Sequence, residues 1–145
     1  MKILFLCTGN SCRSQMAEGY AKHLGGDFLN VKSAGLVAYG VNPRAIQIMK
    51  EDGVDMSQQK STQLTADMFN WADLIITLCG HADEHCPVIP SGKEKRYIPF
   101  EDPAKTTGSE EQILNQFRQV RDQIKKSVET LVEEFKPKHE SKLKV

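Results

Sequence analysis

The chain has 145 residues, and its nineteen lysine and arginine residues balance nineteen aspartate and glutamate residues. This length suits one domain with one core, and the balanced charge excludes the strong field by which proteins attract nucleic acid or an anionic membrane. No apolar run approaches the ~20 residues of a membrane span, and "MKILFLC" is too short for a signal peptide. We therefore expect a cytoplasmic protein with no nucleic-acid or membrane partner.

The first half of the chain predicts strands that alternate with helices. Residues 2–6 form an apolar run without alternation, which is typical of a strand covered on both faces. A helix is expected over residues 14–24 and a second strand over residues 28–35. A further helix is expected over residues 43–52, because this stretch begins with a proline and ends before a glycine.

The second half of the chain continues the alternation. Residues 72–79 are expected to form a strongly buried third strand, and residues 96–100 a weaker strand. From Ser109 to Phe135, apolar residues recur every three or four positions among charged ones, which predicts an amphipathic helix. Ser109 followed by Gln112 predicts a capping box at its start. The apolar positions of this helix are Ile113, Phe117, Val120, Ile124, Val128, Leu131 and Phe135.

This order of elements indicates a single-domain α/β fold over residues 1–135, with a four-stranded parallel sheet flanked by helices. Ligands of such sheets bind beyond the carboxyl ends of the strands. Cys7 ends the first predicted strand and Cys79 ends the third, so the two thiols should lie at one edge of the sheet. We expect a monomer, because the helices account for both sheet faces, and a mobile tail over the charged residues 136–145.

The stretch "CTGNSCRS", residues 7–14, joins the first strand to the first helix. A glycine-containing loop at this place turns backbone N–H groups toward one point, which makes a phosphate-cradle loop. Arg13 adds a fork of donors suited to a tetrahedral oxyanion, and Cys7 lies where the same donors stabilise a nucleophilic thiolate. The expected oxyanion-binding residues are Thr8, Gly9, Asn10, Ser11, Cys12, Arg13 and Ser14.

A simpler interpretation of the loop stays open at this point. Cys7 could be a buried cysteine at the end of a strand, and Arg13 a solvated helix residue. The context of strand, polar loop and helix favours the phosphate cradle. The Cys12 thiol is expected to be structural or incidental in either case.

The loop resembles the active-site loop of the low-molecular-weight tyrosine phosphatase fold, whose signature is Cys-x5-Arg-Ser after the first strand. The following "QMAEG", "SAG" at residues 33–35, "GVNP" at residues 40–43, "ITLC" at residues 76–79 and "DPA" at residues 102–104 are similar to the thioredoxin-coupled arsenate reductases within that fold. The resemblance implies reduction of arsenate to arsenite in arsenic detoxification. It also implies thioredoxin as the electron donor and no metal or flavin cofactor.

By the same resemblance, three cysteines carry the reaction as a relay. Cys7 attacks arsenate, Cys79 attacks Cys7 and releases arsenite, and Cys86 then attacks Cys79 so that thioredoxin can reduce the resulting disulfide. Asp102 matches the general-acid aspartate of the family, and Glu101 is the nearby alternative carboxylate.

The spacing of Cys79 and Cys86 limits how these two cysteines could form a disulfide, and it leaves a second interpretation of the segment open. If it were helical, a rise of ~1.5 Å per residue would separate the two Cα atoms by about 10 Å, whereas a disulfide needs roughly 4.4–6.8 Å. A disulfide between them therefore requires local unwinding. The alternative is a metal site formed by Cys79, His81, His85 and Cys86, although their spacing is not a usual zinc pattern.

Some members of the resembling family bind potassium beside the loop, through residues that correspond to Asn10 and Ser33. They also use an acidic residue in the segment corresponding to residues 59–62, where this chain has "QKST". Lys60 could supply positive charge there. We therefore expect no potassium requirement, and we expect Asn10 and Ser33 to support the loop through hydrogen bonds.

Two other functions compete with arsenate reduction. A phosphotyrosine phosphatase would use Cys7, Arg13 and Asp102, but phosphatases of this fold usually carry proline at the position of Gln15 and tyrosine at that of Ala104. A weak phosphatase side activity is compatible with the cradle. A non-enzymatic sensor that binds arsenite or zinc through its thiols would have no use for an oxyanion loop.

Overall fold

The computed structural model describes residues 1–137 and confirms a single α/β domain with a parallel four-stranded sheet. Its strands are β1 (Lys2–Cys7), β2 (Asn30–Gly35), β3 (Leu74–Thr77) and β4 (Glu94–Tyr97). Its helices are α1 (Arg13–Gly25), α2 (Pro43–Glu51), α3 (Ala66–Trp71), α4 (Gly80–Glu84) and α5 (Glu110–Phe135), with a 3₁₀ turn η1 (Pro103–Lys105). The predicted tail falls mostly on residues 138–145, which lie outside the described residues.

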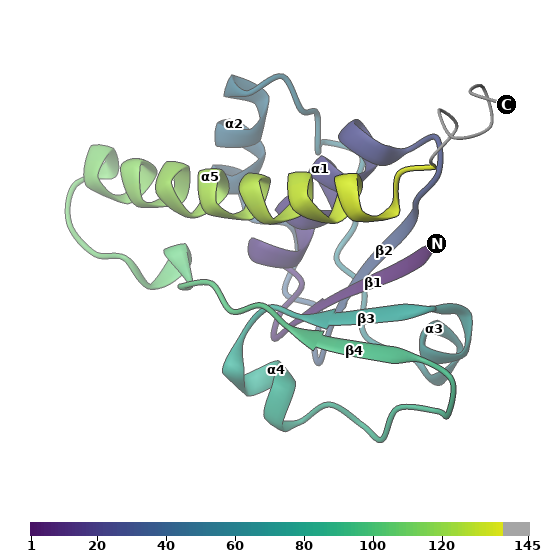
Figure 1. Cartoon of the computed structure of the whole chain (residues 1–145). Coiled ribbons are helices and arrows are strands. Elements are labelled where there is room, and N and C mark those ends of the chain that lie inside the picture. Colours follow the sequence, from purple (N-terminus) through teal and green to yellow (C-terminus); the bar gives the residue numbers. More distant parts are fainter. Residues whose placement is uncertain (138–145) are drawn as a thin grey trace, which may run out of the picture.

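The strand order is β2-β1-β3-β4, so β1 lies inside the sheet with β2 on one side and β3 on the other (Figure 1). Residues 3–6 of β1 are almost fully buried, as expected of an apolar strand covered on both faces. At the carboxyl end of β1, Cys7 pairs with Gly35 of β2. The central strand thus delivers Cys7 to the edge where ligands of parallel sheets bind.

Helices cover both faces of the sheet. Figure 1 shows α1, α2 and α5 gathered on one side, and the short helices α3 and α4 on the other. The apolar face of α5 buries Leu114, Phe117, Val120, Ile124, Val128 and Leu131, whereas Ile113 and Phe135 are partly buried at its margin. The predicted capping box is confirmed, because Ser109 Oγ accepts from the Gln112 N–H at 3.2 Å and Gln112 Oε1 accepts from the Ser109 N–H at 2.9 Å.

The third and fourth strands differ from their predicted bounds. The prediction of a strand over residues 72–79 was too long, because Ala72 still caps α3 and Cys79 already caps α4. The strand predicted at residues 96–100 begins earlier, at Glu94, where backbone pairing with β3 begins. β4 is an edge strand with mostly exposed side chains, so its sequence lacks an apolar run that would mark its start.

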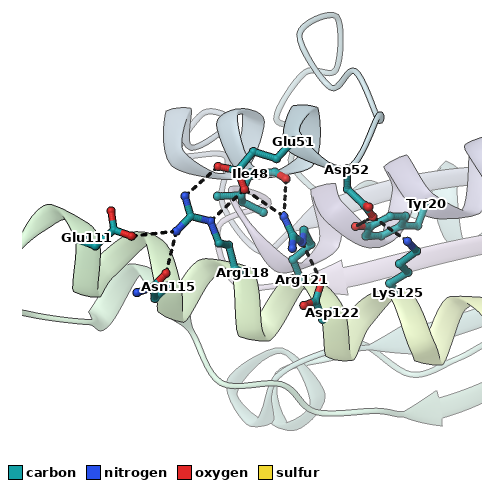
Figure 2. Close-up of polar contacts among 10 residues, drawn as sticks. All are labelled: Tyr20, Ile48, Glu51, Asp52, Glu111, Asn115, Arg118, Arg121, Asp122 and Lys125. Atoms are coloured by element: carbon teal, nitrogen blue, oxygen red, sulfur yellow. Dashed lines mark hydrogen bonds and ion pairs between the residues drawn. The ribbon is translucent and has the colours of Figure 1, made fainter.

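Ion pairs fasten α5 to the end of α2 (Figure 2). Arg118 Nε and Nη2 donate to the Glu51 carboxylate at 2.9 and 2.8 Å. Lys125 Nζ donates to Asp52 Oδ2 at 2.9 Å, and the buried Tyr20 hydroxyl donates to the same oxygen at 2.7 Å. Asp52 thus joins α1 and α5 through a single carboxylate. Across residues 1–137, no helix has the length and apolar character needed to cross a membrane.

Candidate active site

The loop between β1 and α1 points its carbonyl groups away from the space above Cys7. The carbonyl oxygens of Cys7, Thr8, Gly9 and Ser11 accept backbone N–H groups from residues 36–42. Asn10 has a φ of 48°, in the left-handed region that an asparagine tolerates. Within residues 1–137, the N–H groups of residues 9–12 donate to no protein acceptor, so they are available to an oxyanion.

The Ser14 hydroxyl lies 2.8 Å from Cys7 Sγ. Asn10 Nδ2 donates to Ser14 Oγ at 2.8 Å, so the hydroxyl oxygen already accepts one hydrogen bond. The orientation of the Asn10 amide is fixed in turn, because its Oδ1 accepts from the Thr62 N–H at 2.7 Å. The Ser14 hydroxyl keeps its own proton free to donate to Cys7, and when Cys7 is a thiolate this hydrogen bond stabilises it.

The same amide group of Asn10 connects the loop to charged side chains. Its Nδ2 also donates to Ser33 Oγ at 2.9 Å, and the Ser33 hydroxyl donates to Glu18 Oε1 at 2.5 Å. Lys22 Nζ pairs with the other oxygen of Glu18 at 2.5 Å. The expected support of the loop by Asn10 and Ser33 thus has a defined geometry, and Glu18 and Lys22 extend it beyond what the sequence analysis foresaw.

Two glutamines missed by the sequence analysis complete this support. Gln15 Nε2 donates to Asn10 Oδ1 at 2.9 Å and to the Lys60 carbonyl at 3.1 Å. Gln59 Nε2 donates to Gln15 Oε1 at 2.7 Å. Gln15 was noted only as a departure from the phosphatase pattern. Its partners Gln59 and Lys60 lie more than forty positions away, so no local pattern could have indicated these contacts. Lys60 takes part through its backbone carbonyl.

Arg13 and Asp102 face each other across the mouth of the loop. Arg13 Nη2 lies 3.6 Å from Asp102 Oδ2, and Arg13 Nη1 donates to the Phe100 carbonyl at 3.1 Å. Asp102 Oδ1 accepts from the Ala104 N–H at 3.0 Å, which fixes the carboxyl at the start of η1. Glu101, the alternative carboxylate, instead accepts from Gln116 of α5 at 3.1 Å. Both carboxylates line the cleft, and Asp102 is the one that faces Arg13.

Cys79 reaches the same cleft from the other side of the sheet edge. It caps α4, where its Sγ accepts from the Ala82 N–H at 3.4 Å. Its Sγ also lies 3.3 Å from the hydroxyl of Thr8, the residue that follows Cys7 in the loop. Cys7 and Cys79 both line one cleft, together with Arg13 and Asp102. The expected meeting of the two thiols at one sheet edge is therefore confirmed.

Cys86 lies apart from these groups. It follows α4, whereas Cys79 precedes that helix, and it is not among the residues that line the cleft. Its side chain is half-buried, and burial raises the pKa of its thiol above the ordinary range. Cys7, Cys12, Cys79 and Cys86 are all free thiols in this structure.

The remaining sequence expectations concern Cys12 and a metal site. Cys12 is buried, and burial together with the negative charge of Asp102 raises the pKa of its thiol to about 12. The Cys12 side chain is thus a neutral thiol near neutral pH. Among residues 1–137, no three His, Cys, Asp or Glu side chains are placed to hold a metal ion. The alternative site from Cys79, His81, His85 and Cys86 therefore does not form in this conformation.

Comparison with known proteins gives relatives over most of the chain. An arsenate reductase of Halalkalibacterium halodurans is 52% identical over 131 residues, which cover 90% of this chain and 94% of the relative. An arsenate reductase of Bacillus subtilis (strain 168) is 51% identical over 122 residues, which cover 84% of this chain and 88% of the relative.

Solved structures of an arsenate reductase and of a phosphatase share the fold of this chain. An arsenate reductase in the phosphate-binding state superposes with a TM-score of 0.74 at 38% identity, over 92% of this chain and 98% of the other. An arginine phosphatase from Geobacillus stearothermophilus superposes with a TM-score of 0.80 at 25% identity, over 97% and 96% of the two chains. The family model of the low molecular weight phosphotyrosine protein phosphatases matches residues 2–141. The chain, with its Cys-x5-Arg loop at the end of β1, belongs to this family.

Proposed function

We propose that this protein reduces arsenate to arsenite through a relay of Cys7, Cys79 and Cys86, with thioredoxin as the electron donor, in arsenic detoxification. The observation that carries the proposal is that two free thiols, Cys7 and Cys79, line a single cleft beside an oxyanion loop. Hydrolysis of a phosphate ester needs one thiol, whereas a two-electron reduction needs two. The relatives at 52% and 51% identity are arsenate reductases, which supports arsenate reduction over phosphate-ester hydrolysis.

In the first step, the Cys7 thiolate attacks arsenic while the loop N–H groups and Arg13 hold the other oxygens. A sulfur–arsenic bond forms and an arsenic–oxygen bond breaks. Asp102, 3.6 Å from Arg13, donates a proton so that the departing oxygen leaves as water. Arsenic remains pentavalent at this stage.

In the second step, the Cys79 thiolate attacks Cys7 Sγ. The new sulfur–sulfur bond forms as the sulfur–arsenic bond breaks, and arsenic keeps the bonding electron pair. Arsenic is thereby reduced from the pentavalent to the trivalent state, while Cys7 and Cys79 are oxidised to a disulfide. The two thiols supply both electrons for the reduction of arsenic, so these steps need no further redox group.

In the third step, Cys86 attacks Cys79 and frees Cys7 for another cycle. Because α4 separates the two cysteines in the reduced protein, this exchange requires α4 to unwind. The Cys79–Cys86 disulfide is then the substrate for thioredoxin, whose potential of about −270 mV suits such a reduction.

The proposal is tested by arsenite production from arsenate with thioredoxin, thioredoxin reductase and NADPH. The wild type should turn over many times, whereas Cys86→Ser should stop after about one equivalent of arsenite and retain a Cys7–Cys79 disulfide. Val88→Ser, at an exposed position close to Cys86 that does not line the cleft, serves as the matched control and should turn over like the wild type. Absence of arsenite from the wild type would overturn the proposal.

A second candidate function is the hydrolysis of phosphate esters, because Cys7, Arg13 and Asp102 lie in a cleft suited to any tetrahedral oxyanion. An aryl phosphate such as p-nitrophenyl phosphate tests it in the same protein preparation. If the wild type hydrolyses this ester in a Cys7-dependent way and reduces no arsenate, phosphatase activity replaces arsenate reduction as the main function.

A further inference from the structure

Cys79 must lose its proton before it can attack Cys7, and its surroundings restrict where that proton can go. The Cys79 residue is only 7% exposed. Two polar groups of residues 1–137 reach its Sγ: the Ala82 N–H at 3.4 Å and the Thr8 hydroxyl at 3.3 Å. A backbone N–H donates but cannot accept a proton, so the Thr8 hydroxyl is the one of these two protein groups through which the proton can leave.

The Thr8 hydroxyl is itself bonded to a histidine. Thr8 Oγ1 lies 3.2 Å from Nδ1 of His81, a residue in the first turn of α4. A hydroxyl can accept one hydrogen bond while it donates another. Thr8 can therefore accept from the Cys79 S–H and donate to His81 Nδ1 at the same time. Imidazole is the side chain best suited to take up a proton near neutral pH.

A second histidine holds the His81 ring in place. The His85 ring packs against it with centroids 4.4 Å apart. His85 Nδ1 lies 2.9 Å from the His81 carbonyl oxygen, and because a carbonyl only accepts, His85 Nδ1 carries its proton. The His85 ring thus supports His81 without competing for the nitrogen that faces Thr8.

We propose that His81 takes up the proton of Cys79 through the Thr8 hydroxyl, in the second step of the proposed arsenate reduction. Cys79 passes its proton to Thr8 Oγ1 while the Thr8 hydroxyl proton passes to His81 Nδ1. The products are a Cys79 thiolate and a His81 imidazolium, so charge and protons balance. His81 does not touch the reacting sulfur and is therefore a positioning residue that acts through Thr8.

The same three side chains serve both protonation states without moving. Before transfer, the hydrogen bonds run from Cys79 to Thr8 to His81. After transfer, they run from His81 to Thr8 to Cys79, and the thiolate then accepts from both the Thr8 hydroxyl and the Ala82 N–H. When Cys79 attacks, its thiolate becomes part of the new disulfide, and the imidazolium later returns its proton to water.

The other ionisable side chains that line the cleft do not contact Thr8 or Cys79 through hydrogen bonds in residues 1–137. Arg13 and Asp102 face each other, and Glu101 is bonded to Gln116 of α5. Besides the loop thiols, the cleft also has Tyr97 and Lys105 in its lining. Among residues 1–137, none of these side chains is hydrogen-bonded to Thr8 Oγ1 or to Cys79 Sγ. His81 is therefore the proton acceptor connected to Cys79.

The test measures the ionisation of Cys79 without arsenate. In a Cys7→Ser background, Cys79 is alkylated with iodoacetamide from pH 5 to pH 10, and its modification is followed by peptide mass spectrometry. His81→Asn retains a hydrogen-bond acceptor for Thr8 but cannot hold the proton. His23→Asn is the control, because it removes an exposed imidazole of α1 that does not line the cleft.

We expect Cys79 in His81→Asn to react about tenfold more slowly at pH 7 than in the parent, and equally fast above about pH 9.5, where a thiol ionises unaided. The parent and His23→Asn should give the same rate profile over the whole range. Thr8→Val should match His81→Asn, and Thr8→Ser should match the parent.

Identical profiles for the parent and His81→Asn would overturn the inference. Because alkylation uses no arsenate, this outcome is separate from the fate of the proposed function. A protein that reduces arsenate with a His81-independent profile would retain its function and lose only this role for His81. If the profile depends on His81 but the protein reduces no arsenate, proton transfer from Cys79 to His81 is supported and the proposed arsenate reduction is wrong.

Discussion

Gly35 at the end of β2 lies so close to Asn10 in the loop that a Cβ atom on Gly35 would be 2.7 Å from the Asn10 backbone nitrogen. The same atom would be 2.4 Å from the Val37 carbonyl oxygen and 2.8 Å from that of Thr8. All three neighbours are backbone atoms, which cannot turn aside as a side chain can. The shape of the oxyanion loop therefore depends on a residue without a side chain on the neighbouring strand.

Gly35→Ala should destabilise the protein by about 1–3 kcal/mol, because the added methyl group forces the loop backbone to shift. It should also weaken the binding of phosphate, a tetrahedral anion that needs the loop N–H groups. Urea unfolding and titration calorimetry measure the two effects. Gly80→Ala is the control, since its Cβ would meet only the Tyr97 hydroxyl at 3.4 Å and should change stability by less than about 0.5 kcal/mol. Unchanged phosphate binding in Gly35→Ala would contradict the prediction.

Ser14→Ala should slow the alkylation of Cys7 at pH 7 by about tenfold, because the thiolate loses a charge-assisted hydrogen bond of at least about 1.5 kcal/mol. The rate of iodoacetamide modification at Cys7 gives this effect directly. Ser11→Ala is the matched control within the same loop, because the contact of its hydroxyl is a 4.0 Å approach by Cys12 Sγ. Equal Cys7 reactivity in the two variants would show that the Ser14 hydroxyl does not stabilise the thiolate.

Asp102→Asn should lower the rate of the first step by about 10²-fold, because an amide cannot protonate the departing oxygen. The appropriate measurement is a single-turnover reaction with arsenate, followed by quenching and mass spectrometry. Glu101→Gln removes the neighbouring carboxylate, which is bonded to Gln116, and should remain within about threefold of the wild type. The reverse ranking of the two variants would assign the acid to Glu101.

Transfer of the disulfide from Cys7–Cys79 to Cys79–Cys86 should accelerate as the pH rises above 7. Burial raises the pKa of Cys86, so little of the attacking thiolate is present near neutral pH and its fraction grows up to about tenfold per pH unit. Quenched-flow samples analysed by non-reducing mass spectrometry resolve the two disulfides. A transfer rate that does not change between pH 7 and pH 8.5 would mean that unwinding of α4, and not thiol ionisation, limits this step.

Asp52→Asn should reduce stability at pH 7 by about 1 kcal/mol and have no effect at low pH. Hydrogen bonds from Lys125 and then from Tyr20 lower the pKa of Asp52. A carboxylate with a lowered pKa stabilises the fold above the pKa of its unfolded state, and this contribution disappears as the pH falls through the folded pKa.

The comparison for Asp52→Asn is urea unfolding at pH 7 and at pH 3 or below. Asp122→Asn is the control on α5, since its partner is the adjacent Arg121 at the surface, and it should stay within about 0.5 kcal/mol of the wild type. A stability loss in Asp52→Asn that persists unchanged at low pH would indicate a packing effect instead of a charge effect.

The predicted elements that proved correct were those with strong local patterns. The apolar run of β1, the capping box at Ser109 and the apolar repeat of α5 each depend on neighbours in the sequence. By contrast, α3 was missed because it is only six residues long and buries Phe69 alone. Its Trp71 lies under the Lys32 ammonium group at 4.5 Å, a contact between distant segments that no local pattern reveals.

In the candidate site, too, features encoded in adjacent residues were predictable and contacts between distant segments were not. Cys7 and Arg13 were recognisable because seven consecutive positions determine both the turn and its chemistry. The support of Asn10 by Thr62 and the approach of Thr8 to Cys79 join residues that are distant in the sequence and are brought together by the sheet order β2-β1-β3. These contacts depend on tertiary structure, so the identity of the site could be predicted but its hydrogen-bond network could not.

The placement of the thiols also divides the molecule into parts with different local unfolding energies. Cys7 ends a strand that is paired on both sides, whereas α4 buries only Ala82 and ends just before Cys86. We therefore expect helix α4 to open at a small fraction of the global unfolding free energy, and the amide hydrogens of β1 to exchange only on global unfolding. In the proposed relay, this difference would let a Cys79–Cys86 disulfide reach a reductase while the anion-binding loop stays folded.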